Sequence, residues 1–167
     1  DGVGPRDARP RRVNIHWGEV SESNAFGTQE FIKLCRLVGA EPYIVGNVGS
    51  GTVRELREWV EYCNYAGDST LAQRRAADGS PDPLDITFWG VGNENWGCGG
   101  SFSPEDYCTA FRRYATYVRG FGKDLFVIAC GPAGNDVEWT VRFFRKLRHD
   151  YWDFRNIHGF AAHYYCG

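Results

Sequence analysis

The sequence predicts an α/β fold in which a parallel sheet is joined by crossover helices. From residue 28 onward, helix-like and strand-like segments alternate, and the strand-like ones are short, apolar and bounded by glycine. Such alternation is typical of parallel sheets. It leaves two architectures open, a doubly wound sheet or part of a (β/α)8 barrel. A whole barrel needs about 250 residues, so four strands would make half of one.

The expected elements follow from apolar spacing and from residues that start or stop a helix. We expect helices at residues 28–38, 53–63 and 137–147, and one that starts at residue 103 and stops at Gly120 or Gly122. We expect strands at residues 42–45, 86–91, 125–130 and 157–165. Thr28 is a plausible N-cap, and Ser103 followed by Pro104 marks a strong helix start. Residues 64–85 are polar and predict a surface loop.

Composition restricts the possible partners. The 167 residues suit one domain, residues 1–167, and carry a net charge of −2 without a run of Lys or Arg, so we expect no nucleic-acid partner. No apolar stretch approaches the roughly 18 residues that span a membrane, and we expect no membrane partner. Aromatic residues reach 16%, which fits either a bulky core or a site where flat rings stack on sugars.

Neither a metal nor another cofactor is expected. The six cysteines form no CxxC pair and no Cys/His set with zinc-like spacing. We expect buried free thiols at Cys35, Cys63 and Cys130, whereas Cys98 and Cys108 are close enough to pair, which the sequence does not decide. The glycine-rich stretch at residues 46–51 lacks the spacing of a nucleotide-binding loop.

Chemistry in parallel α/β folds gathers at the carboxyl ends of strands, and one acidic residue occupies such a place. Glu94 follows the strand at 86–91 directly after Gly92 and Asn93. It is either a surface carboxylate in a loop or a catalytic acid, whose partial desolvation would raise its pKa and suit it to donate a proton. Asn93 could bind a substrate hydroxyl.

Further candidates lie at both ends of the chain. Strand alternation puts His163 and Tyr165 on one face and Tyr164 on the other. The first two form either a core pair or a set that hydrogen-bonds a carboxylate and holds its charge state. Trp17 could be a wall on which a sugar stacks or a core aromatic under a long loop.

Five blocks of sequence occur in order along nearly the whole chain: RPRRVNIHWGEVSESNAFGTQEF, GAEPYIVGNVGSGT, WVEYCN, FWGVGNENWGCGG and HYY. Together they resemble the glycoside hydrolase family 51 α-L-arabinofuranosidases. Gly-Asn-Glu after a strand is shared by a broad clan of retaining barrel enzymes. The first two blocks narrow the resemblance to this family.

The resemblance implies a (β/α)8 barrel, of which this chain would hold strands three to six. It implies an enzyme that removes terminal α-L-arabinofuranosyl groups from arabinose-containing polysaccharides and oligosaccharides, with retention and without a metal. Glu94 would be the acid/base. The family's substrate-binding tyrosine at the end of strand six would be Tyr165, with Tyr164 as its rival. The implied substrate-binding residues are Asn93, Trp17, His163 and Tyr165.

The chain also departs from the family. Retention needs a second carboxyl group about 5–5.5 Å away, and the family's nucleophile follows strand seven, beyond this chain, which has no Met and reads as an internal piece. The isolated chain could therefore be a silent half-barrel that binds sugar weakly. The parent could also be a xylanase, an endoglucanase or a β-galactosidase of the same clan. Unpaired sheet edges favour a homo-oligomer. The cellular location stays open, since such enzymes occur inside and outside cells.

Overall fold

The computed structural model describes residues 1–150 and 156–166, and the chain divides into two compact units. The first unit comprises Asp1–Pro42, Glu58–Ile86 and Phe121–Lys123, and the second comprises Tyr43–Arg57, Thr87–Gly120 and Asp124–Gly167. The second unit holds the parallel sheet. That residues 1–167 form one barrel domain stays a prediction.

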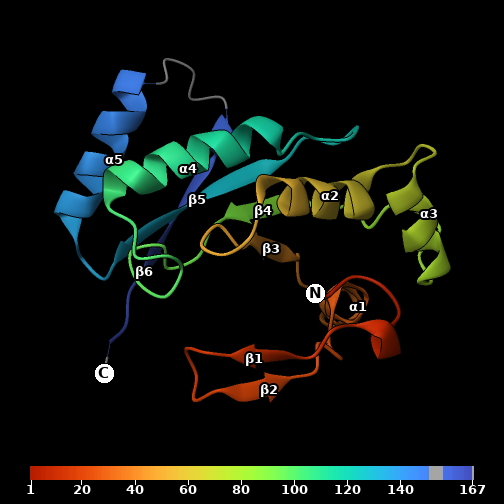
Figure 1. Ribbon diagram of the computed structural model, residues 1–167. Helices are drawn as coiled ribbons and strands as arrows, with labels where there is room; N and C mark the ends of the chain where they lie inside the picture. Colours follow the sequence, from red (N-terminus) through yellow and green to blue (C-terminus); the bar gives the residue numbers. More distant parts are fainter. Residues whose placement is uncertain (151–155, 167) are drawn as a thin grey trace. The chain divides into compact units, whose positions relative to one another are not determined.

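The sheet of the second unit has four parallel strands in the order β3-β4-β5-β6, as Figure 1 shows. Their bounds are Tyr43–Gly46, Phe88–Val91, Phe126–Ala133 and Gly159–His163. Each bound lies within three residues of the predicted one. The spatial order follows the chain order, whereas a doubly wound sheet reverses its order at a switch point. The structure is therefore a partial (β/α)8 barrel.

Two helices, α4 (Pro104–Tyr117) and α5 (Val137–Asp150), cover one face of this sheet (Figure 1). The Ser103 hydroxyl caps α4 by accepting the Asp106 N–H at 3.1 Å, as predicted, but α4 ends before Gly120. Aromatic rings fill the interface, with Phe143 centred 5.9 Å from Trp139 and 5.4 Å from Phe160 of β6. Ring pairs at such distances add stability beyond their buried area.

The opposite sheet face is only partly covered. Tyr43, Phe88 and Phe126 lie side by side in the register of β3, β4 and β5. Tyr43 is 40% exposed and Phe126 is 38% exposed. In a closed barrel this face points inward and packs against side chains from the remaining strands.

The hydroxyl of one tyrosine connects the carboxyl ends of β4 and β5 by hydrogen bonds. The hydroxyl of the fully buried Tyr107 donates to the Val91 carbonyl at 2.5 Å and accepts the Cys130 N–H at 2.6 Å. Regular pairing of β4 with β5 ends at Val91 and Ala129. The hydroxyl therefore bridges the two strands just where their ladder stops. Burial raises the pKa of Tyr107, so the hydroxyl keeps its proton.

The first unit contains the elements that precede and follow β3. They are η1 (Arg6–Ala8), a hairpin of β1 (Arg12–Asn14) and β2 (Val20–Glu22), α1 (Thr28–Val38) and α3 (Thr70–Ala77). The remaining helix, α2 (Val53–Asn64), begins in the second unit and ends in the first. The helix at 28–38 is confirmed, but its N-cap is Gly27 and not Thr28.

An ion pair anchors the start of α1. The guanidinium of Arg9, which is buried, lies 2.8 Å from the Glu30 carboxylate, and that carboxylate accepts the Gly27 N–H at 2.8 Å. The hydrogen bond from Arg9 lowers the pKa of Glu30 to about 2. Glu30, the third residue of α1, thus satisfies the N–H of the N-cap Gly27, as the glutamate of a capping box does.

The predicted surface loop at residues 64–85 was wrong in part, because it contains α3. Ser69 caps this helix by accepting the Ala72 N–H at 3.2 Å. The guanidinium of Arg75, which is buried, donates to four backbone carbonyls, those of Tyr62, Tyr65, Ser80 and Pro81. A polar side chain thus organises a buried segment, and a search for apolar periodicity does not detect it.

All six cysteines are free thiols. Burial of Cys35, Cys63 and Cys130 is confirmed, and Cys108 is buried too, whereas Cys98 and Cys166 are exposed. Within residues 1–150 and 156–166, no helix combines the length and the apolar character that crossing a membrane requires.

Replacing Tyr107 with Phe should lower the free energy of unfolding by about 2 kcal/mol or more, because two buried backbone groups lose their partner. Thermal or urea unfolding measures the change. Tyr117→Phe, on the exposed part of the same helix, is the matched control and should unfold as the unmodified chain does. Equal stability of all three proteins would contradict the bridging role.

Candidate active site

A tight turn after β4 presents Glu94. Gly92 has φ 88° and Glu94 has φ 46°, both in the left-handed region, which a residue with a side chain rarely adopts. The Gly92 N–H donates to the Gly46 carbonyl at 3.0 Å and extends the pairing of β3 with β4. The strained turn is thus held by the sheet, and strain of this kind is common at functional sites.

The loop after Glu94 folds back on that residue's backbone. The Glu94 carbonyl accepts the N–H groups of Gly97 at 2.8 Å and Gly99 at 3.0 Å. The buried Asn95 donates from its side chain to the Gly99 carbonyl at 2.7 Å. A Cβ at Gly99 would lie 1.9 Å from the Asn93 carbonyl oxygen. The glycines in this motif therefore let the loop pack closely against the backbone that carries the carboxylate.

Three side chains converge on the Glu94 carboxylate. The Tyr165 hydroxyl donates to Oε1 at 2.7 Å, and Nδ1 of His163 lies 3.0 Å from the same oxygen. The Cys98 thiol donates to Oε2 at 3.3 Å. The Glu94 side chain is 17% exposed. The structure thus brings together three residues that the sequence singled out, Glu94, His163 and Tyr165.

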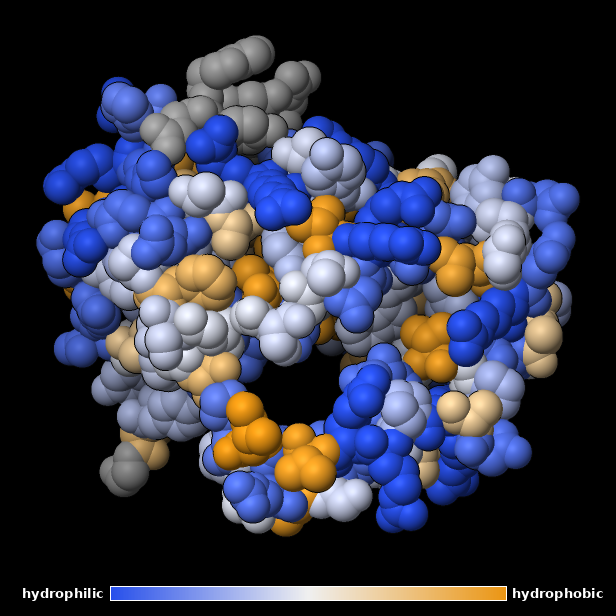
Figure 2. Space-filling view, in the orientation of Figure 1, coloured by the Kyte–Doolittle hydropathy of each residue, from blue (hydrophilic) through white to orange (hydrophobic). Residues whose placement is uncertain are grey.

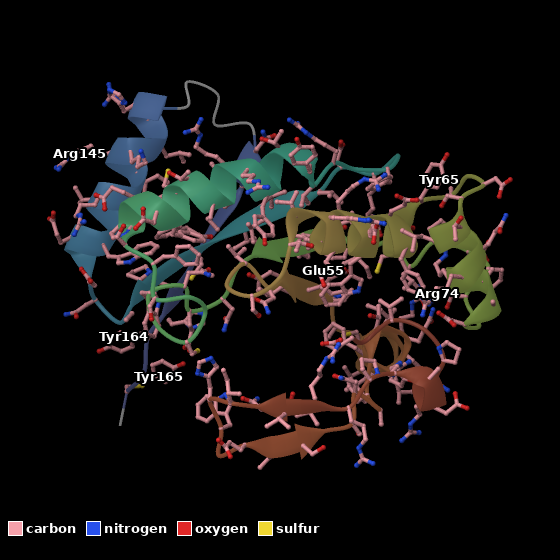
Figure 3. The ribbon with its side chains drawn as sticks, viewed as in Figure 1. Glu55, Tyr65, Arg74, Arg145, Tyr164 and Tyr165 are labelled. Atoms are coloured by element: carbon pink, nitrogen blue, oxygen red, sulfur yellow. The ribbon has the colours of Figure 1, made fainter. Side chains whose placement is uncertain are left out.

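The two tyrosines after β6 lie differently. Figure 3 shows Tyr164 and Tyr165 extending to opposite sides of the chain, as strand alternation predicts. Tyr165 reaches Glu94, whereas Tyr164 is 72% exposed. The geometry favours Tyr165 over its rival for a role beside the carboxylate.

The predicted direction of the Glu94 pKa was wrong for this chain. The hydrogen bond from Tyr165, and next that from His163, lower the pKa of Glu94 and outweigh its desolvation. Glu94 is therefore an anion at neutral pH. The stability that its bonds contribute is present above the ordinary pKa of a glutamate and is lost as the pH falls through the lowered pKa.

The other two predicted residues are exposed. Asn93 precedes Glu94 in the turn after β4. Trp17 lies in the turn between β1 and β2 of the first unit and is 70% exposed, so it is not a core aromatic in this chain. Its hairpin also exposes Val13 and Val20. Figure 2 shows hydrophobic side chains in orange in the region that Figure 1 labels β1 and β2. That Asn93 and Trp17 bind sugar stays a prediction.

Sequence reasoning missed Cys98, which it considered only as a disulfide partner. Its position four residues after Glu94 could have suggested proximity, but only the folded loop brings the thiol to the carboxylate. Among the side chains that the structure describes, no group of three or more His, Cys, Asp or Glu is placed to hold a metal ion. The contacts of Glu94 with Tyr165, His163 and Cys98 make this site a hydrogen-bonded carboxylate.

A hydrogen-bonded carboxylate at the carboxyl ends of the strands of a partial (β/α)8 barrel is typical of barrel glycoside hydrolases. Comparisons with known proteins narrow this class. Residues 1–165 match the family model described as the α-L-arabinofuranosidase 1 domain. The chain belongs to the glycoside hydrolase family 51 α-L-arabinofuranosidases.

Individual relatives agree with this assignment. An intracellular exo-α-L-arabinofuranosidase of Bacteroides ovatus is 46% identical over 99% of this chain and 31% of its own length. The crystal structure of the family 51 arabinofuranosidase from Xanthomonas axonopodis pv. citri matches with a TM-score of 0.89 and 41% identity, over 98% of this chain and 32% of that one. The α-L-arabinofuranosidase of Thermotoga maritima in complex with arabinose matches with a TM-score of 0.78 and 39% identity, over 87% and 30%. The chain thus spans about a third of the length of these relatives.

Tyr165→Phe should raise the pKa of Glu94, because the largest of the effects that lower it disappears. Titration of the Glu94 carboxyl carbon by NMR measures the shift. Tyr164→Phe, which alters the neighbouring exposed ring, is the matched control and should leave the Glu94 titration where it is. An unchanged Glu94 pKa in Tyr165→Phe would show that the hydrogen bond between Tyr165 and Glu94 is absent in solution.

Proposed function

We propose that this chain carries the acid/base half of the active site of a retaining α-L-arabinofuranosidase. The complete enzyme would remove terminal α-L-arabinofuranosyl groups from arabinose-containing polysaccharides and oligosaccharides. The observation that carries this proposal is the Glu94 carboxylate at the end of β4, hydrogen-bonded by His163 and Tyr165 from the end of β6. The family assignment supports the substrate class.

Two steps follow from the chemistry of retention. In the first, protonated Glu94 gives its proton to the leaving oxygen while a second carboxylate attacks the anomeric carbon and forms a glycosyl-enzyme. In the second, the Glu94 anion takes a proton from water, and that water releases the sugar. The second carboxylate would come from the part of the barrel that this chain does not span.

The lowered pKa of Glu94 fits this cycle. A second carboxylate about 5–5.5 Å away would raise the pKa of Glu94, since like charges disfavour joint ionisation. The raised pKa would let Glu94 act as an acid in the first step. Formation of the glycosyl-enzyme removes the second negative charge, and the hydrogen bonds from Tyr165 and His163 would then favour the anion that the second step needs.

The remaining residues would bind the sugar. Asn93, exposed beside Glu94, offers both a donor and an acceptor to a sugar hydroxyl. Trp17 offers an exposed ring on which an apolar sugar face could stack. His163 and Tyr165 would hold the acid/base and border the sugar at the same time.

A second interpretation applies to the chain by itself: it is catalytically silent and at most binds sugar weakly. The observation that favours it is the lowered pKa of Glu94, because an anion at neutral pH cannot donate the proton of the first step. The xylanase, endoglucanase and β-galactosidase alternatives gain no support from the comparisons, whose relatives are named arabinofuranosidases.

The test of the proposed function is hydrolysis of 4-nitrophenyl α-L-arabinofuranoside by the complete enzyme and by its Glu94→Gln variant. The variant should lose about 10²–10⁴-fold in rate, the contribution that general acid–base catalysis makes. Glu138→Gln, at an exposed position in the first turn of α5, is the matched control and should keep full activity. A Glu94→Gln enzyme with unchanged turnover would overturn the assignment, and the 167-residue chain alone should show no turnover.

Self-association is a further part of the proposal. Strands β3 and β6 each have one neighbour in the four-stranded sheet, and an unpaired strand edge is a template for pairing with another chain. Light scattering at micromolar concentration should therefore give a mass above that of one 18.9 kDa chain. A monodisperse monomer would contradict this expectation.

A further inference from the structure

The three donors at Glu94 are divided unequally between its two oxygens. Oε1 is bonded by the Tyr165 hydroxyl at 2.7 Å and faces Nδ1 of His163 at 3.0 Å. Oε2 is bonded by the Cys98 thiol at 3.3 Å. A carboxylate oxygen has about two lone-pair sites. Oε1 is thus filled when His163 donates, whereas among the described residues Oε2 has Cys98 as its one donor and keeps one site open.

The donors also differ in strength. A hydroxyl or an imidazole N–H bound to a carboxylate forms a strong, charge-assisted hydrogen bond, whereas a thiol is a weak donor. A proton placed on Oε1 would have to displace Tyr165 or His163. A proton placed on Oε2 meets one open site and one weak donor, so Oε2 is the oxygen that can gain and lose a proton most easily.

We propose that Oε2 is the oxygen through which Glu94 exchanges its proton with the sugar oxygen and with water, and that Cys98 is a positioning residue that orients this oxygen. The proposal rests on the proposed acid/base function and deepens it. When Oε2 carries the catalytic proton, the Cys98 thiol can rotate and leave the oxygen to the substrate. When Oε2 is an anion, the thiol donates to it again.

The loop explains how the thiol reaches this oxygen. The Glu94 carbonyl accepts the N–H groups of Gly97 and Gly99, which flank Cys98, so the backbone on both sides of the thiol is tied to Glu94 itself. Cys98 is exposed, so burial in a core does not account for its position. The hydrogen bond to Glu94 raises the pKa of Cys98, which keeps the sulfur protonated as a donor.

The first experiment titrates the Glu94 carboxyl carbon by NMR in the 167-residue chain. Cys98→Ala should raise the Glu94 pKa, because a donor to Oε2 is lost, and Cys98→Ser should keep it low, because a hydroxyl still donates. Cys166→Ala, at the other exposed cysteine, is the matched control and should change nothing. An unmoved Glu94 pKa in Cys98→Ala would overturn the contact on which the proposal stands.

A reversible modification covers the case in which a variant folds poorly. Methyl methanethiosulfonate converts the thiol to a methyl disulfide and releases methanesulfinate, which removes the S–H donor. In a Cys166→Ser background, treatment should raise the Glu94 pKa and dithiothreitol should restore it. A Glu94 titration that stays unchanged when mass spectrometry shows modified Cys98 would also overturn the proposal.

The second experiment uses the complete enzyme and separates this proposal from the proposed function. Cys98→Ala should lower kcat by about fivefold, the factor that one net hydrogen bond represents. It should also move the alkaline limb of the pH profile, which reports the acid, to higher pH, and Cys98→Ser should restore both. If Glu94→Gln is inactive and the limb of Cys98→Ala does not move, the role of Cys98 is wrong and the acid/base stands. If Glu94→Gln is fully active, the proposed function itself is wrong.

Discussion

The site depends on parallel pairing of three strands, because Glu94 and two of its three donors come from strands that are not neighbours. Glu94 follows β4, whereas His163 and Tyr165 belong to β6 and its end, and β5 lies between them. Two strand spacings amount to about 10 Å, which side chains of these sizes can span only from the same edge of the sheet. Parallel pairing places all three carboxyl ends at that edge.

Two local devices keep this arrangement in register. The Tyr107 hydroxyl joins Val91 to Cys130 where regular pairing of β4 with β5 ends. In the loop that follows β4, the Asn95 N–H contacts the Cys130 sulfur at 3.4 Å. The Glu94 carbonyl accepts the N–H groups of Gly97 and Gly99 in the same loop. The position of the carboxylate is therefore determined by buried backbone and side-chain contacts, and the three donors act on a group whose main chain is already fixed.

The sequence predicted those features whose signals lie within a few neighbouring residues of the chain. A few adjacent residues are enough to recognise the Ser103 cap, each short strand and the acid that follows Gly92. The start of α4, the sheet and the place of Glu94 at the end of β4 could therefore be predicted. The direction of the Glu94 pKa could not, because it depends on a hydroxyl 71 positions away. The helix α3 was not predicted because the side chain that buries it is Arg75. A segment rich in residues of this polar type is normally assigned to the surface.

The crowding at Gly99 has a consequence for how this segment can vary. A side chain there would meet the Asn93 carbonyl oxygen, so even an alanine would have to displace the main chain next to Glu94. Positions 98 and 99 are thus adjacent in the chain but differ in how well they accept substitutions. The first can exchange one small donor for another while the path of the loop is kept, whereas the second allows almost no change. A library that randomises this loop would retain folded, site-competent members chiefly among those that leave position 99 as glycine.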